Sequence, residues 1–181
     1  TFRRHTDPYV VQQIVDVHGP LDVDRFQRAT EIVAARHRAL SAAFTTTTDG
    51  TPVAVHAPGT APDFEVVDAC TLPAGTDTGT VVERCAAADR SRGFDLATPP
   101  LTRYTLVRRS DDLTTMVQTV HHIVADGWSV PLVLEDLLTA YGGAPFDAPP
   151  ARFADFVDWL ADRDAAADRA AWSPGLAGID E

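Results

Sequence analysis

The stretch that decides the fold is residues 113–129, which read LTTMVQTVHHIVADGWS. The part up to residue 121 is rich in β-branched side chains, as is typical of a strand. A loop follows at 122–128, and apolar side chains recur at helical spacing after Ser129. We therefore expect a strand, a loop and a helix, with polar side chains gathered where the strand ends.

Further strands surround this stretch. Residues 102–109 predict the preceding strand, and Ser110-Asp111-Asp112 predicts the hairpin turn that joins the two. Residues 9–18 predict another strand, which Gly19-Pro20 ends. Shorter strands are expected near 41–46, 52–57 and 64–68.

Helices are predicted between the strands. Asp22 is placed to cap a helix in which apolar side chains recur at spacings of three and four. This stripe comprises Val23, Phe26, Ala29, Val33, His37 and Leu40. A weaker, Ala-rich pattern predicts a second helix near 78–91.

Two more helices follow the central loop. Ser129 is the expected N-cap of the first, and Gly142-Gly143 ends it. Its buried stripe is expected to comprise Val130, Val133, Leu134, Leu137, Leu138 and Tyr141. An amphipathic helix from Phe153 could continue past Trp172. The whole pattern predicts the α/β (α+β) class, a two-layer sandwich of a largely antiparallel mixed sheet covered by helices.

Composition excludes several classes of function. With 181 residues, 45% of them hydrophobic and 23% charged, the chain is typical of one globular domain. No run of about 20 apolar residues or secretion signal is present, so we expect no membrane association and a cytoplasmic location. All 15 basic residues are Arg and the net charge is -11, which disfavours nucleic acid. Cys70 and Cys85 match no metal or redox spacing and are expected to be reduced, partly buried thiols without function.

The polar cluster at 121–129 is the candidate site. Adjacent residues of a strand point to opposite faces, so His121 and His122 cannot easily share a metal. One should be structural and buried, and the other exposed. Ser129 lacks the elbow motif of a nucleophile, whereas an exposed imidazole suits general acid/base work. The alternative is that both histidines satisfy buried hydrogen bonds while Asp126 caps the following turn.

These residues resemble a known family. The sequence His-His-x-x-x-Asp-Gly at 121–127, continued by Trp128-Ser129, is similar to the signature of condensation domains from non-ribosomal peptide synthetases, within the chloramphenicol-acetyltransferase-like superfamily. Three other segments resemble the family's motifs in order and spacing: 36–44 (RHRALSAAF), 93–96 with Pro100-Leu101 (GFDL, PL) and 153–159 (FADFVDW). Arg38 and Ser41 stand where the family usually has Glu and Arg.

The resemblance implies one lobe of a larger domain. The family's first motif and its C-terminal lobe are missing, so residues 1–181 are predicted to be an N-terminal lobe. The implied reaction joins a donor acyl or peptidyl thioester to the amine of an acceptor aminoacyl thioester. Both are held on the phosphopantetheine arms of upstream and downstream carrier domains, and the chain itself is expected to bind no cofactor or metal. Its other implied partners are the C-terminal lobe and an adjacent adenylation domain.

The resemblance also implies residue roles. His122 acts as base or hydrogen-bonds the attacking amine, and the Gly127 amide is a candidate oxyanion donor. Asp126 is expected to be structural, in a salt bridge with Arg36. His121, Trp128 and Ser129 support the site by loop packing and helix capping.

Two alternatives to this function remain. A stand-alone acyltransferase of the superfamily is disfavoured by the Trp-Ser ending and the Arg-His motif. A non-catalytic recruiting domain is disfavoured because its histidine motif would be damaged. Because the family's active tunnel lies between two lobes, the isolated chain is expected to be inactive.

Overall fold

The computed structural model describes residues 7–178, which form two units that divide between Pro149 and Pro150. Each unit is described by itself. No helix within the described range is long and apolar enough to cross a membrane.

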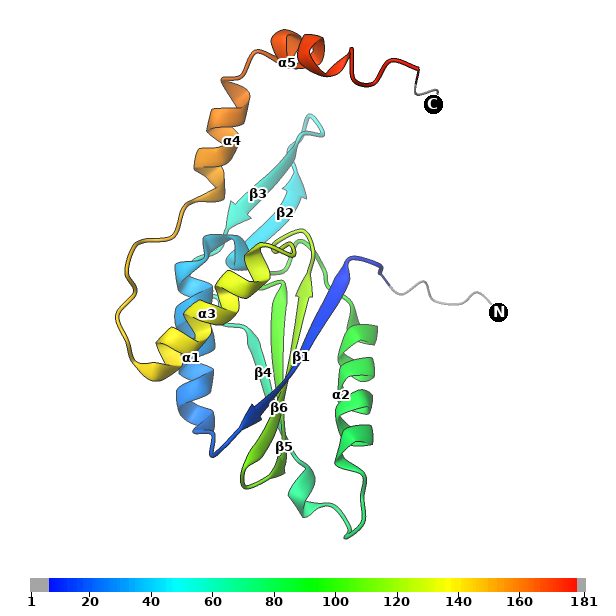
Figure 1. Ribbon diagram of the computed structural model, residues 1–181, viewed down its shortest axis with the longest axis vertical. Helices are drawn as coiled ribbons and strands as arrows, with labels where there is room; N and C mark the ends of the chain where they lie inside the picture. Colours follow the sequence, from blue (N-terminus) through cyan, green and yellow to red (C-terminus); the bar gives the residue numbers. More distant parts are fainter. Residues whose placement is uncertain (1–6, 179–181) are drawn as a thin grey trace. The chain divides into compact units, whose positions relative to one another are not determined.

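The first unit is organised by a four-stranded sheet in the order β1-β6-β5-β4 (Figure 1). Its strands are β1 (Val10–His18), β4 (Asp63–Asp68), β5 (Thr102–Ser110) and β6 (Leu113–His121). β6 pairs antiparallel with both neighbours, and β4 pairs parallel with β5. A separate antiparallel hairpin consists of β2 (Ala42–Thr46) and β3 (Pro52–His56). The predicted strands and the largely antiparallel mixed sheet are thus confirmed.

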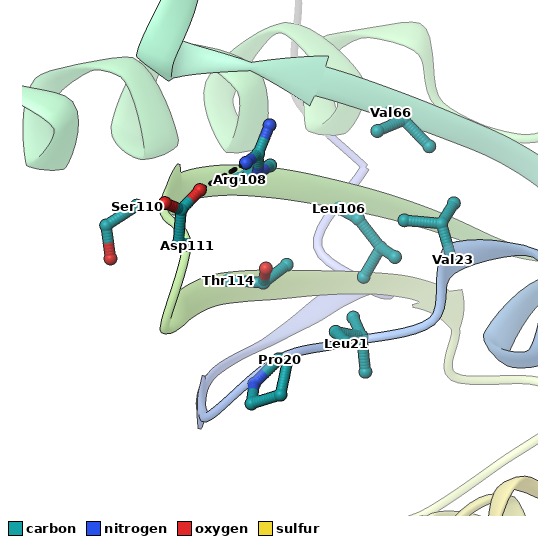
Figure 2. A pocket seen from close by; sticks show the side chains of 9 residues that line it. All are labelled: Pro20, Leu21, Val23, Val66, Leu106, Arg108, Ser110, Asp111 and Thr114. Carbon is teal, nitrogen blue, oxygen red and sulfur yellow. Dashed lines mark hydrogen bonds and ion pairs between the residues drawn. The ribbon is translucent and has the colours of Figure 1, made fainter.

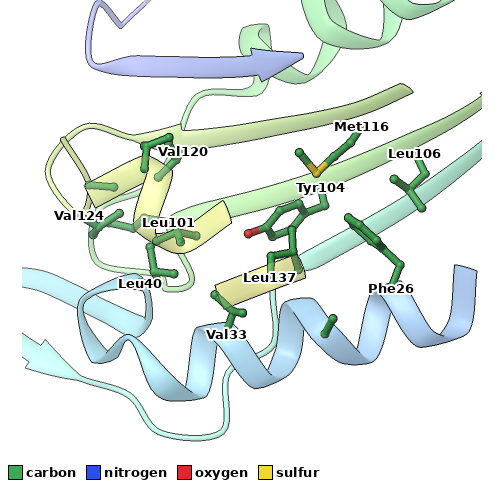
Figure 3. Close-up of a cluster of buried hydrophobic side chains, with 14 residues drawn as sticks. Phe26, Val33, Leu40, Leu101, Tyr104, Leu106, Met116, Val120, Val124 and Leu137 are labelled. Atoms are coloured by element: carbon green, nitrogen blue, oxygen red, sulfur yellow. The ribbon is translucent and has the colours of Figure 1, made fainter. Parts of the chain in front are cut away.

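Helices cover both faces of the four-stranded sheet. On one face, α1 (Val23–Arg36) and α3 (Ser129–Gly142) pack on a core that contains Phe26, Tyr104 and Leu137 (Figure 3). On the other face, α2 (Thr78–Arg92) packs through Val82 and Ala86 on Val107 and Val117. The predicted α/β class is confirmed, but the unit has three layers rather than two. Successive residues of a strand point to opposite faces, and the second face carries Val107 and Val117, which form their own buried cluster with α2.

The ends of α1 follow from local sequence. The Asp22 carboxylate accepts a hydrogen bond from the Arg25 backbone N–H at 3.0 Å, which confirms the predicted N-cap. The helix ends at Arg36, before the last two residues of the predicted stripe. His37 is the C-cap, and Leu40 is buried from the short 3-10 helix η1 (Arg38–Ser41).

α2 and α3 each end at a glycine. Gly93 follows α2 with φ of 62°, and Gly143 follows α3 with φ of 72°, so both occupy the left-handed region that favours glycine. Val130, Val133 and Leu137 of the predicted α3 stripe are buried, whereas Leu138 is exposed because it lies on the side of the helix away from the core.

The second unit contains two short helices, α4 (Phe153–Ala161) and α5 (Ala165–Trp172). The helix from Phe153 therefore does not continue past Trp172. Asp164 interrupts it, because its carboxylate accepts hydrogen bonds from the backbone N–H groups of Ala166 and Ala167 and starts a new helix.

The two cysteines are free thiols, as predicted, but only Cys85 is partly buried. Cys70 is exposed, because it lies in the short 3-10 turn η2 (Ala69–Thr71) after the edge strand β4. Desolvation raises the pKa of both thiols, so the thiolate form is disfavoured at neutral pH.

Candidate functional site

His121 is the last residue of β6, one of the two central strands of the sheet, and His122 lies in the turn that follows. The His121 backbone N–H donates to the Leu101 carbonyl at 3.0 Å, and the His122 N–H donates to the Tyr9 carbonyl at 2.7 Å. Both donor groups are therefore fixed by chain segments that precede β5 and β1. These two hydrogen bonds tie the backbone of both histidines to the sheet.

His121 is the buried histidine. Its side chain is 6% exposed, and its ring centroid lies 6.1 Å from that of Tyr9 and 6.2 Å from that of Phe94. Nδ1 accepts a hydrogen bond from the Ile123 backbone N–H at 3.1 Å, and Nε2 lies 3.3 Å from an Asp7 carboxylate oxygen. An Nδ1 that accepts carries no proton, so the ring N–H is at Nε2 and faces Asp7.

His122 is the exposed histidine. Within residues 7–178 its imidazole has no side-chain hydrogen-bond partner, so both ring nitrogens are available to a ligand. The prediction that one histidine is buried and the other exposed is confirmed. The alternative in which both satisfy buried hydrogen bonds is wrong for His122.

Asp126 stabilises the loop after the histidines through hydrogen bonds to residues of the same loop. Its Oδ1 accepts hydrogen bonds from the backbone N–H groups of Trp128 and Ser129, at 3.1 and 2.8 Å, and from the Ser129 hydroxyl at 2.6 Å. The hydroxyl and backbone N–H of Ser129, followed by the Trp128 N–H, hold the pKa of Asp126 below its ordinary value. The carboxylate therefore stays ionised at neutral pH and orders the start of α3.

The predicted salt bridge between Asp126 and Arg36 is wrong. Arg36 lies at the end of α1 and donates through Nε to the Asp136 carboxylate on α3 at 2.8 Å. His37 Nε2 lies 2.6 Å from the same oxygen, Oδ2. Arg36 therefore ties α1 to the middle of α3. The hydrogen bonds of the Asp126 carboxylate come from Trp128 and Ser129 of its own loop.

Asp136 was missed by the sequence reasoning. Burial opposes its ionisation, but the hydrogen bonds and positive charge of Arg36 and His37 outweigh this effect and lower its pKa. The available signal was a carboxylate one residue before the buried Leu137, on a largely apolar helix.

Ser129 and Trp128 do not have the roles predicted for them. Ser129 is the first helical residue rather than the N-cap, and its hydroxyl donates to Asp126. Trp128 is 88% exposed, so it does not pack in the loop. Asp126 caps the following turn, as the alternative interpretation of the cluster predicted, because its carboxylate reaches two consecutive backbone N–H groups.

Gly127 presents open backbone beside these residues. A side chain built at this position would meet nothing within 4 Å. Its amide N–H has no acceptor in the described part of the chain. The amide can therefore donate to an incoming oxyanion, although steric crowding within the described chain does not require glycine there.

A hollow of about 390 Å³ lies elsewhere on the sheet and is lined in part by Leu21, Leu106, Arg108 and Thr114 (Figure 2). Thr114 is near the start of β6, whereas His121 ends this strand, so the hollow lies toward the opposite end of the sheet. Arg108 is paired with Asp68 and Asp111. The hollow is therefore separate from the histidine site.

The sequence and fold place the chain in a family. Residues 1–180 match the condensation domain family, and the chain belongs to that family, as its motifs predicted. Among curated proteins it is 34% identical over 178 residues to bacitracin synthase 3 of Bacillus licheniformis, and 33% identical over 196 residues to the isonitrile lipopeptide synthase of Mycobacterium tuberculosis. These matches cover 96% and 99% of this chain but only 3% and 8% of the two relatives.

Solved structures show the same fold. The starter condensation domain of rhizomide synthetase RzmA is 22% identical with a TM-score of 0.81, covering 96% of this chain and 43% of that one. The first condensation domain of the CDA synthetase is 25% identical with a TM-score of 0.76, covering 96% and 46%. The chain thus spans less than half of each of these two solved structures.

Proposed function

We propose that residues 1–181 are the N-terminal lobe of a condensation domain that forms amide bonds in non-ribosomal peptide synthesis. The observation that carries this proposal is the exposed His122, mounted on the sheet beside the buried His121, within the intact family signature. A non-catalytic recruiting role is disfavoured because no residue of that signature is lost.

The chemistry needs few protein groups. The acceptor amine attacks the carbonyl carbon of the donor thioester, the C–S bond breaks, and the thiol of the donor arm leaves. A thioester is already activated, so the main contributions are orientation, handling of the amine proton and stabilisation of the oxyanion. His122 accepts the amine proton or hydrogen-bonds the amine, and the Gly127 N–H donates to the oxyanion.

Asp126 acts by shaping the loop. Its three hydrogen bonds fix the backbone between Gly127 and α3, and through it the Gly127 amide. It does not pair with His122 among the described contacts. Asp126 is therefore a positioning residue in this proposal.

The substrates would arrive on phosphopantetheine arms of an upstream and a downstream carrier domain. The C-terminal lobe of the same condensation domain would close the site over His122, and an adenylation domain would lie next to it in the assembly line. The proposed location is the cytoplasm. The support for these partners is the family membership of the chain.

The proposal is tested by presenting loaded donor and acceptor carrier domains to this chain alone and to the complete condensation domain. We expect amide product only from the complete domain. Free coenzyme A thioesters and free amines or alcohols form the second arm of the experiment. Preference for those substrates would favour a stand-alone acyltransferase and contradict the carrier-dependent function.

Replacing Asp126 by alanine in the complete domain should slow amide formation by about tenfold, because the loop loses its fixed geometry. Asp126→Asn is the matched control, since its amide oxygen can still accept the loop's hydrogen bonds. Hydrogen exchange should be faster at Trp128 and Ser129 in the alanine variant. Unchanged exchange in Asp126→Ala would show that the carboxylate does not order the loop.

The stability of the loop should also depend on pH. The pKa of Asp126 is lowered in the folded chain, so its contribution to stability is present above the unfolded value and is lost as pH falls through the folded pKa. An NMR titration of its carboxyl carbon should show a midpoint below 3.8. A midpoint above 3.8 would contradict the hydrogen bonding described here.

A further inference from the structure

A buried ion pair joins α2 to β5. Arg103 and Asp89 are both 7% exposed, and the Arg103 Nε donates to Asp89 Oδ1 at 2.7 Å. The Arg103 terminal nitrogens also donate to the Gly93 carbonyl at 2.8 Å and to the Asp89 carbonyl at 3.0 Å. The guanidinium is therefore held in one orientation by hydrogen bonds from each of its nitrogens.

Phe94 stacks on this guanidinium. Arg103 Cζ lies 3.9 Å from the centroid of the Phe94 ring. The hydrogen bonds of a guanidinium lie in its plane, so its face is left free to cover an aromatic ring. Gly93, with its positive φ, turns the chain out of α2 immediately before Phe94.

Phe94 in turn contacts the buried histidine. Its ring and that of His121 are 6.2 Å apart between centroids with an interplanar angle of 88°, an edge-to-face arrangement. Tyr9 lies on His121 as well, at 6.1 Å, and its carbonyl receives the His122 N–H. Asp89 therefore contacts Arg103, Arg103 contacts Phe94, and Phe94 contacts His121. His121 is adjacent in sequence to His122.

We propose that Phe94, held by the Arg103–Asp89 pair, is a positioning residue for catalysis that fixes His121 and through it the orientation of His122. This inference rests on the proposed function of the site. The ring contact of Phe94 is with His121, and the proposal assigns Phe94 no contact with the substrate. Its effect is on how often the His122 imidazole is aimed at the reacting amine.

The test compares the same substitution at two half-buried phenylalanines in the complete condensation domain. Phe94→Leu removes the ring beside His121. Phe64→Leu makes an equal change on β4, where the ring contacts Phe26 at 6.3 Å. We expect Phe94→Leu to lower kcat for amide formation by about tenfold to a hundredfold with KM for the donor carrier unchanged, and Phe64→Leu to change kcat by less than about twofold.

Two further variants separate positioning from general damage. Phe94→Tyr keeps the ring and should restore kcat. Arg103→Lys keeps the charge but loses the planar stack, so it should lower kcat in the same direction as Phe94→Leu. Equal losses of kcat at positions 64 and 94, or full activity in a folded Phe94→Leu variant, would overturn the proposal.

A His122→Ala arm distinguishes this inference from the proposed function. If His122→Ala abolishes the reaction while a folded Phe94→Leu variant keeps the wild-type kcat, only the positioning role fails. If His122→Ala retains the full rate, the proposed function fails, and hydrogen exchange of residues 122–128 still tests the contact. Faster exchange in Phe94→Leu than in Phe64→Leu supports the positioning of the loop, and equal exchange contradicts it.

Discussion

Replacing His122 by alanine in the complete condensation domain should lower the rate of amide formation by about a hundredfold or more, the usual contribution of a positioned acid or base. The imidazole is exposed and makes no side-chain hydrogen bond within residues 7–178, so its removal should leave the fold intact. The rate is measured with saturating loaded carrier domains, and folding by circular dichroism.

His18→Ala is the matched control for this variant. His18 is also exposed and is the last residue of β1. It pairs with Leu113, the first residue of β6, so it lies at the opposite end of that strand from His122. Its loss should leave the rate within about twofold of wild type. An equal decrease in both variants would show that losing a surface imidazole, rather than this site, is responsible.

Replacing Arg103 by alanine should destabilise the domain by about 3–5 kcal/mol, because the Asp89 carboxylate would stay buried with only the 3.3 Å contact to the exposed Arg92. The Asp89 side chain is 9% exposed, so water can replace the lost hydrogen bonds only in part. The change is measured as the free energy of urea unfolding.

Arg92→Ala provides the comparison for Arg103. Arg92 contacts the same Asp89 at 3.3 Å and also pairs with Asp63, but its side chain is 54% exposed. Its loss should cost less than about 1 kcal/mol, as is typical of surface pairs. Similar costs for the two arginines would contradict the special role assigned to burial.

The parts of the fold that were predictable from sequence are governed by local rules. The runs at 10–18 and 113–121 form strands because their β-branched side chains suit a sheet, and Asp22 caps α1 because its side chain reaches a nearby N–H. The contrast between the buried His121 and the exposed His122 was also predicted from the alternation of a strand, although β6 ends at His121 and His122 lies in the turn that follows.

The errors concern choices that local pattern does not determine. Asp126 and Ser129 are both good capping residues, and only the course of the loop decides that Asp126 receives the N–H groups. Arg36 lies 100 positions from its partner Asp136, a pairing fixed by how α1 packs on α3. Arg103 was missed because an arginine in a strand gives no sign of a buried carboxylate beside it.

The most direct test of the central claim is single-turnover transfer between loaded carrier domains, followed by the mass of each intact carrier. With the wild-type condensation domain, the donor acyl group should appear on the acceptor carrier through an amide bond. With His122→Ala it should remain on the donor carrier. Transfer by the variant at the wild-type rate would show that His122 is not catalytic and would contradict this account of the site.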